Sequence, residues 1–143
     1  MSGMIQTVEG IPAVDIASPV FSSDGHFIGA TTALISPGDL FADQMSEIQD
    51  QPEYGFSVMQ TDGLIIYDTD TMQVGRVLFD DPLYKPYPGL IAFGRQVAAS
   101  ETGYGSYSFL DRDLVRNVTK QAYWSTVGIR GTKWRLVITK EVP

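Results

Sequence analysis

The sequence predicts an α+β fold built on a five-stranded antiparallel sheet. Two short apolar runs joined by an Asp-Gly turn, Tyr54–Gln60 and Leu64–Asp68, are typical of a β-hairpin. A segment with helical spacing of apolar residues follows, and three further strand-like runs close the chain. A hairpin, a helix and three consecutive strands in this order are typical of an α+β layout.

A second hairpin and a helix are predicted before this sheet. Ile11–Phe21 and His26–Ile35 are rich in β-branched residues and flank a turn that contains Gly25. Ser36 is suited to cap a helix, because a proline follows it at the first helical position. Apolar residues then keep helical spacing to about Gln49.

The rest of the chain supplies the second helix and the last three strands. Asp70–Pro88 is rich in Pro, Gly and Asp and is predicted to be a loop with short helical turns. Gly89–Ser100 is predicted to be a helix, because apolar residues gather on one of its sides. The closing strands are predicted at Gly105–Leu110, Thr119–Val127 and Lys133–Lys140.

Composition excludes several classes of function. The net charge is −7 and no Lys/Arg cluster is present, so a nucleic-acid partner is not expected. The chain has no cysteine, which removes disulfides, thiol catalysis and Cys-ligated metals. No apolar run approaches the roughly 20 residues of a transmembrane helix. With His26 as the single histidine, we expect an exposed turn residue there and no metal.

No catalytic motif appears in its required context. The sequence has no Gly-x-Ser-x-Gly elbow and no P-loop. Asp62, Asp68 and Asp70 match a calcium loop only loosely, and Asp80-Asp81 and Asp111-Arg112-Asp113 are expected to be solvated loops. We therefore expect no enzymatic function. A carboxylate-dependent hydrolase stays open as an alternative, because sequence does not give the separation of carboxylates in space.

Three groups of residues together resemble a known family. The hairpin begins Gly55-Phe56, turns at Asp62-Gly63 and leads to Val74-Gly75-Arg76. The C-terminal part contains Gly105-Ser106-Tyr107-Ser108-Phe109, Ala122-Tyr123-Trp124 and the run from Gly131 to Ile138. These motifs resemble the Cache family of PAS-like extracytoplasmic sensor domains. The resemblance implies a PAS-like five-stranded antiparallel sheet with helices on its faces, preceded by an extra N-terminal β-hairpin and helix.

The N-terminal part resembles the end of a preceding Cache unit in a double Cache domain. The residues that carry this likeness are Ile16–Phe21, Asp24–Gly29 and the helix from Asp39. We therefore expect residues 1–50 to be a hairpin plus linking helix, and residues 51–143 to be a PAS-like Cache domain that would be the membrane-proximal unit. Whether the hairpin pairs with the main sheet or is the remnant of another unit stays open at this point.

The resemblance also implies a function and a location. It implies an extracytoplasmic sensory domain of a membrane signalling receptor, either a chemoreceptor or a sensor kinase. Such a domain binds a small organic acid, amino acid or amine, or relays the binding of one. It lies in the periplasm or at the cell surface and meets the membrane only through flanking helices. A ligand-free structural or dimerisation module, working as a homodimer, is the alternative.

Aromatic and basic side chains gather in the half of the chain that would line a PAS-like pocket. A small carboxylate needs a cation for its charge and apolar walls for its body. Tyrosine supplies both a wall and a hydroxyl. No cofactor is expected, because the pocket-side helix lacks the histidine that a haem would need and no cysteine is present for a flavin adduct. The predicted ligand-binding residues are Tyr67, Arg76, Tyr84, Lys85, Tyr87, Tyr107, Lys120, Tyr123 and Trp124.

Overall fold

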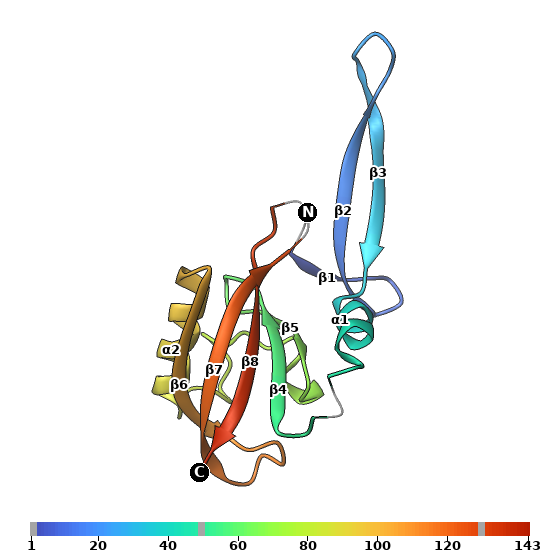
Figure 1. Cartoon of the computed structure of the whole chain (residues 1–143). Helices are drawn as coiled ribbons and strands as arrows, with labels where there is room; N and C mark the ends of the chain where they lie inside the picture. The colour runs from blue at the N-terminus through green and yellow to red at the C-terminus, as the bar shows by residue number, and fades with distance from the viewer. Residues whose placement is uncertain (1–2, 49–50, 129–130) are drawn as a thin grey trace. The chain divides into compact units, whose positions relative to one another are not determined.

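The chain folds into two compact units, Met1–Ser46 and Glu47–Pro143, each with its own antiparallel sheet (Figure 1). The structure is a computed structural model that describes residues 3–48, 51–128 and 131–143. The first unit holds a three-stranded sheet and the second a five-stranded one. The predicted five-stranded antiparallel sheet, preceded by a hairpin and a helix, is confirmed.

The first unit is a hairpin with one added strand. β2 (Pro12–Phe21) pairs with β3 (Phe27–Ile35) as predicted, and β1 (Met4–Gln6) pairs with the other edge of β2. Gly25 takes a φ of 85° in the turn, which favours glycine over other residues. The strand β1 was not predicted, because three residues are too few to display a strand pattern.

α1 (Pro37–Met45) follows β3 directly and is capped as the sequence predicts. The Ser36 hydroxyl accepts a hydrogen bond of 3.3 Å from the backbone N–H of Asp39. The helix ends at Met45 because the N–H and hydroxyl of Ser46 both bond to the carbonyl of Asp43. The end expected near Gln49 lies outside the described residues.

The second unit is a sheet in the order β5-β4-β8-β7-β6, with every neighbouring pair antiparallel. Each predicted strand is present, and β6 begins before the predicted Gly105. α2 (Pro88–Ala99) is the predicted helix, and a short 3-10 helix, η1 (Thr71–Gln73), lies before it. None of the helices in the described ranges has the length and apolar character to cross a membrane. The strands are β4 (Tyr54–Met59), β5 (Ile65–Asp68), β6 (Thr102–Leu110), β7 (Asn117–Val127) and β8 (Trp134–Val142).

The turn between β4 and β5 requires glycine for two reasons. Gly63 takes a φ of 94°, and a Cβ there would lie 2.6 Å from Cδ2 of Phe79. The carboxylate of Asp62 accepts the N–H of Leu64 at 3.1 Å, which closes the turn. The turn therefore brings the loop that carries Phe79 against the hairpin.

α2 packs on one face of the five-stranded sheet, which we call the inner face (Figure 1). Phe93 of α2 lies with its ring centroid 4.8 Å from Tyr107 of β6 and 5.5 Å from Trp124 of β7. On the opposite face, Tyr104 and Tyr123 stack on each other at 4.7 Å and are both exposed. The hydrophobic core of the unit therefore lies between the inner face and α2.

Arg135 of β8 fixes the C-terminal end of α2 to the sheet. Its guanidinium donates to the carbonyl oxygens of Val97 at 2.9 Å and Ala98 at 3.1 Å, and to the hydroxyl of Thr126 at 2.7 Å. These carbonyls belong to the last turn of α2, where the carbonyl groups have no N–H donors left within the helix. The buried cation also lies at the negative end of the helix dipole.

Replacement of Arg135 by methionine is expected to destabilise the second unit by about 3 kcal/mol, because buried carbonyls lose their donors. Urea unfolding followed by circular dichroism measures this change. Lys133→Met is the matched control, because Lys133 is exposed and lies 3.9 Å from Glu101. The control is expected to change stability by about 0.5 kcal/mol or less. Equal effects of the two substitutions would contradict the role of Arg135.

Candidate functional site

A cavity of about 390 Å³ lies in the second unit, along the inner face of the sheet. Its lining comes from all five strands, from α2 and from the loop between β5 and α2. One end is apolar, so it can hold the body of a small organic molecule. The apolar lining residues are Pro52, Phe56, Met59, Ile65, Leu78, Leu90, Phe93, Val97, Phe109 and Val137.

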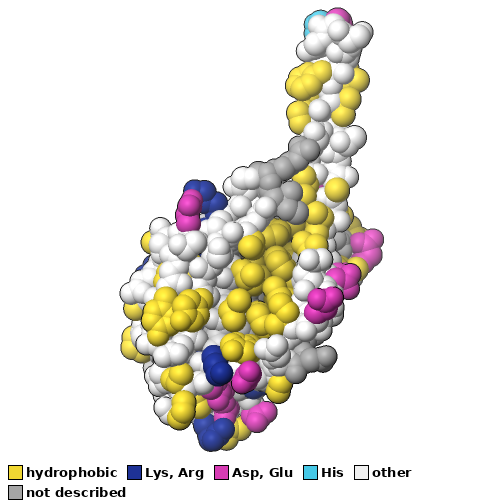
Figure 2. All heavy atoms as spheres, viewed as in Figure 1, with side chains coloured by type: hydrophobic (Ala, Val, Ile, Leu, Met, Phe, Trp, Pro, Cys, Tyr) yellow, Lys and Arg dark blue, Asp and Glu magenta, His cyan; other side chains and the backbone are white. Residues whose placement is uncertain are grey.

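Strand direction gathers the charged lining residues at the other end. β4 and β7 begin at this end of the sheet, and β5 and β8 finish there, because neighbouring strands are antiparallel. Figure 2 shows side chains of both charges at this lower end of the unit. The charged lining residues are Glu53, Asp68, Asp70, Asp111, Arg112, Lys120 and Glu141.

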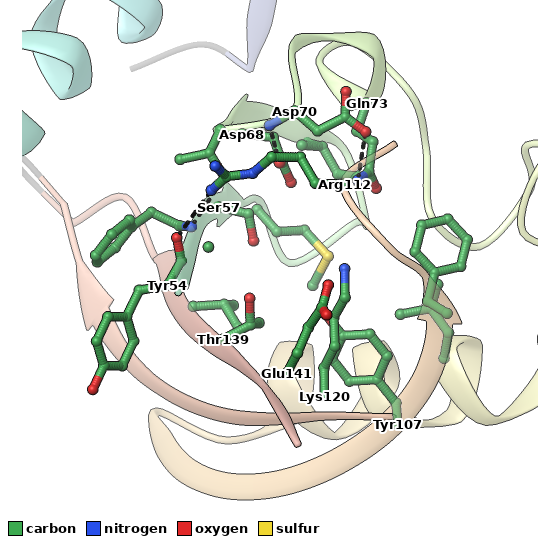
Figure 3. A pocket seen from close by; sticks show the side chains of 18 of the residues that line it. Tyr54, Ser57, Asp68, Asp70, Gln73, Tyr107, Arg112, Lys120, Thr139 and Glu141 are labelled. Atoms are coloured by element: carbon green, nitrogen blue, oxygen red, sulfur yellow. Dashed lines mark hydrogen bonds between the residues drawn. The ribbon is translucent and has the colours of Figure 1, made fainter. Parts of the chain in front are cut away.

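Three of the lining residues form a row across neighbouring strands. Tyr107 of β6 lies opposite Lys120 of β7, which lies opposite Glu141 of β8. Figure 3 shows the charged ends of Lys120 and Glu141 side by side and directed into the cavity. Burial lowers the pKa of Lys120, and the carboxylates of Glu141 and Asp68 oppose that fall. Burial also raises the pKa of Tyr107.

Asp68 stands at the end of β5, facing this row from the other side of the cavity (Figure 3). Its carboxylate accepts the backbone N–H of Asp70 at 2.7 Å. Burial raises the pKa of Asp68 to about 7, because the ionised form loses contact with water. The N–H of Asp70 lowers this pKa and the Asp70 carboxylate raises it, while Lys120 and Arg112 lower it. A carboxyl group with such a shift, in a cavity, is a candidate functional group.

Two loops complete the polar end. Asp70 caps η1 by accepting the N–H of Met72 at 3.1 Å, and it also accepts the side-chain amide of Gln73 at 3.2 Å. The guanidinium of Arg112, in the link between β6 and β7, donates to the carbonyl of Tyr54 at 3.3 Å (Figure 3). The loops therefore bring Asp70 and Arg112 to the cavity, together with Asp111, which directly precedes Arg112.

Asp111 stabilises the second of these loops. Its carboxylate accepts the backbone N–H groups of Val115 and Arg116 at 2.9 and 3.2 Å, and it pairs with the Arg116 guanidinium at 3.0 Å. The N–H of Val115, followed by the contacts with Arg116, lowers the pKa of Asp111. The carboxylate therefore has a structural role at the edge of the cavity.

Two of the predicted ligand-binding residues, Tyr107 and Lys120, line the cavity. The other predicted residues are all described and lie outside its lining. Tyr84 is fully buried behind it and donates to the amide oxygen of Gln73 at 3.2 Å. Tyr87 packs its ring on Phe109 at 4.9 Å.

The remaining predicted residues have structural or surface positions. Arg76 pairs with Asp81 at 3.0 Å, and Lys85 is exposed. Trp124 lies in the core, with its indole N–H donated to the carbonyl of Ser100 at 3.1 Å. The last two residues of the prediction, buried Tyr67 of β5 and exposed Tyr123 of β7, are not among the lining residues either.

Sequence reasoning missed most of the polar end. Asp68, Asp70, Asp111 and Arg112 were expected to lie in a loose calcium-loop pattern or in solvated loops, yet they line the cavity. The available signal was the position of Asp68, directly after an apolar strand and therefore at the edge of the core. No group of three or more His, Asp or Glu that could hold a metal ion occurs among the described residues.

Comparisons with known proteins identify sensor domains. Residues 1–37 match the family model described as "HK/GC/Chemotaxis protein-like, sensor domain". No curated protein matches the chain. The family match therefore falls on the first unit, and the evidence on the second comes from solved structures.

Three solved structures illustrate the likeness. An extracellular ligand binding receptor from Desulfohalobium retbaense has a TM-score of 0.71 and 30% identity over 97% of this chain. The periplasmic sensory domain of the Campylobacter jejuni chemoreceptor Tlp1 has a TM-score of 0.61 and 15% sequence identity over 96% of this chain. The ligand binding domain of the Pseudomonas aeruginosa amino acid chemoreceptor PctB, in complex with L-Arg, has a TM-score of 0.55 and 21% sequence identity over 92% of this chain. This chain spans 22%, 46% and 45% of those structures, respectively.

These findings confirm the resemblance to the Cache sensors and the expected class of extracytoplasmic sensory domain. The matched family model describes sensor domains, and two of the structures are named as extracellular or periplasmic. Sensory domain families are generally not enzymes. The likeness to the Campylobacter and Pseudomonas receptors, at 15% and 21% identity, is one of fold.

Asp68→Asn is expected to stabilise the second unit at pH 8 by on the order of 2 kcal/mol. The folded-state pKa of Asp68 is raised to about 7, so between about pH 4 and pH 7 the folded protein holds a proton that the unfolded chain has lost. At pH 8 the folded protein holds an ionised carboxylate at a site where burial disfavours the charge. The wild type therefore loses stability as pH rises from about 4 to about 7, and the variant lacks this loss. Urea unfolding at several pH values measures the difference.

Asp62→Asn is the matched control for this substitution. Asp62 also accepts the N–H of the residue two positions later, but it lies on an exposed turn. Its replacement is expected to change stability by about 0.5 kcal/mol or less at every pH. A stability difference between Asp68→Asn and the wild type that stays constant with pH would contradict the burial of a titrating carboxyl group.

Proposed function

We propose that this chain is the sensory part of a membrane signalling receptor and that the cavity of its second unit binds a small organic ligand. The cavity is the observation that carries the proposal. It combines an apolar end with a charged end, and its volume of about 390 Å³ is within the range of small-molecule sites. The sensory class of the matched proteins supports the same function.

The lining defines the chemistry of the ligand. Lys120 and Arg112 can receive a carboxylate, and Asp68, Asp70 and Glu141 can receive an ammonium group. The apolar end can hold a short hydrocarbon body. A small organic acid, an amino acid or an amine fits this combination. The Pseudomonas chemoreceptor with bound L-Arg supports a ligand of this size.

A ligand-free structural or dimerising module is the weaker reading. In such a module the aromatic side chains would fill the inner space of the unit. Here Tyr84, Tyr87 and Trp124 pack in or against the core on the inner face, and a cavity of about 390 Å³ remains beside that core. The open cavity therefore favours ligand binding over a purely structural role.

The first unit has a separate place in this proposal. The sensor-domain model matches residues 1–37, which fall within a three-stranded sheet that does not share strands with the second unit. This match supports the view that the first unit is the closing part of a preceding Cache unit. The second unit is then the PAS-like unit that follows it.

Thermal melting of the chain with small carboxylates, amino acids and amines tests the proposed binding. One chemical class is expected to raise the melting temperature by several degrees, because a ligand that binds only the folded state stabilises it. A panel that leaves the melting temperature unchanged throughout would contradict the proposal.

Lys120→Met then locates the ligand within the chain. The variant is expected to weaken the binding of a carboxylate at least tenfold, since it removes a half-buried cation from the cavity. An amine that has no carboxylate is expected to bind this variant at least as tightly as it binds the wild type. Lys133→Met is the control, because Lys133 lies outside the cavity lining and is exposed. Equal changes in both variants would place the binding elsewhere.

A further inference from the structure

Carboxylates outnumber cations at the polar end of the cavity. Glu53 pairs with Lys140 at 3.5 Å, and Asp111 pairs with Arg116 at 3.0 Å. Lys140 and Arg116 are not among the described lining residues, so these two carboxylates are neutralised from outside the cavity. The charged lining residues that remain are the carboxylates Asp68, Asp70 and Glu141 and the cations Lys120 and Arg112.

Of these three carboxylates, Asp68 is the one whose pKa is raised by burial. Among the described residues, no Lys or Arg nitrogen lies within 4.0 Å of the Asp68 carboxyl group, so Asp68 forms no ion pair there. Lys120 lies in register with Glu141, and Arg112 donates to a backbone carbonyl at 3.3 Å. Within the part of the chain that the structure describes, the Asp68 carboxylate accepts one hydrogen bond, from the backbone N–H of Asp70. A positively charged group that entered the cavity would meet this carboxylate (Figure 3).

Groups from every side of the cavity act on the charge of Asp68. Tyrosine titrates near 10 in water, and burial raises the pKa of Tyr84 and Tyr107 further, so both stay neutral near pH 7. Asp70 acts on Asp68 in two opposite ways. Its backbone N–H donates to the Asp68 carboxylate and lowers the pKa of Asp68, whereas its own carboxylate repels the Asp68 charge and raises that pKa. The titratable and charged groups around Asp68 are Asp70, Tyr84, Tyr107, Arg112, Lys120 and, beyond Lys120, Glu141.

We propose that a proton and a positively charged group of the ligand compete for the Asp68 carboxylate, so that the external pH sets the apparent affinity of the sensor. This inference rests on the proposed function of the cavity as a ligand site. A cation binds the ionised carboxylate and must displace the proton from the neutral form. Binding of the cation therefore releases a proton, and acid weakens the binding.

The size of the effect follows from the titration of Asp68. With the pKa of Asp68 at about 7, the carboxylate is ionised at pH 8.5 and almost wholly protonated at pH 5.5. If only the ionised form binds the cation, the apparent dissociation constant rises about 30-fold between these two pH values. Without competition at Asp68, the constant would stay nearly level over this range.

The test uses two probes with the same body and opposite charge. 2-Phenylethylammonium is a cation and 3-phenylpropionate an anion at both about pH 5.5 and about pH 8.5. Each is titrated calorimetrically into the full chain at constant ionic strength, and melting curves are recorded in parallel. Asp68→Asn removes the proposed competition. Asp62→Asn is the control, because Asp62 has the same type of local hydrogen bond on an exposed turn.

The ammonium probe is expected to bind the wild type and Asp62→Asn about 30-fold more tightly at the higher pH, and Asp68→Asn without this pH dependence. Equal binding at both pH values, the same dependence in Asp68→Asn, or no binding of the ammonium probe would overturn the inference. Binding of the carboxylate probe, together with absent or pH-independent binding of the ammonium probe, would overturn the inference while leaving the proposed function in place. The proposed function falls if the whole ligand panel leaves the melting temperature unchanged.

Discussion

The structure of the second unit depends on how α2 is held against the inner face of the sheet. Arg135 binds the carbonyls of Val97 and Ala98 at the end of the helix, and Phe93 packs on Tyr107 and Trp124. The helix thereby completes the apolar core. The charged strand ends line the same cavity as the apolar residues of α2, so a ligand there would contact the helix and β8 together.

Much of the fold could be predicted from local patterns. The Asp-Gly turns, the cap at Ser36 and the apolar side of α2 are short-range signals, and the structure confirms each of them. β1 could not be predicted, because its three residues become a strand only by pairing with β2. The early end of α1 depends on side-chain bonds of Ser46, which the apolar spacing does not reveal.

The site was predicted less well, because alternation along a strand does not say which face is the inner one. Lys120 and Trp124 share a face of β7 with the core, whereas Tyr123 has the opposite, exposed side. Aromatic residues were expected to contact the ligand, yet Tyr84 and Trp124 are packed in the hydrophobic core. Asp68 and Arg112 come together only through strand order and loop closure, which are long-range properties.

The central claim is that the Asp68 carboxyl group lies in the cavity, where a ligand can contact it, and that its burial lowers the stability of the unit. A carbon-13 NMR titration of the aspartate carboxyl carbons tests it most directly, with Asp68→Asn used to assign the signal of Asp68. The account predicts that the Asp68 signal titrates with a midpoint near 7. A midpoint near the ordinary value of about 4 would contradict it, because the group would then be fully hydrated.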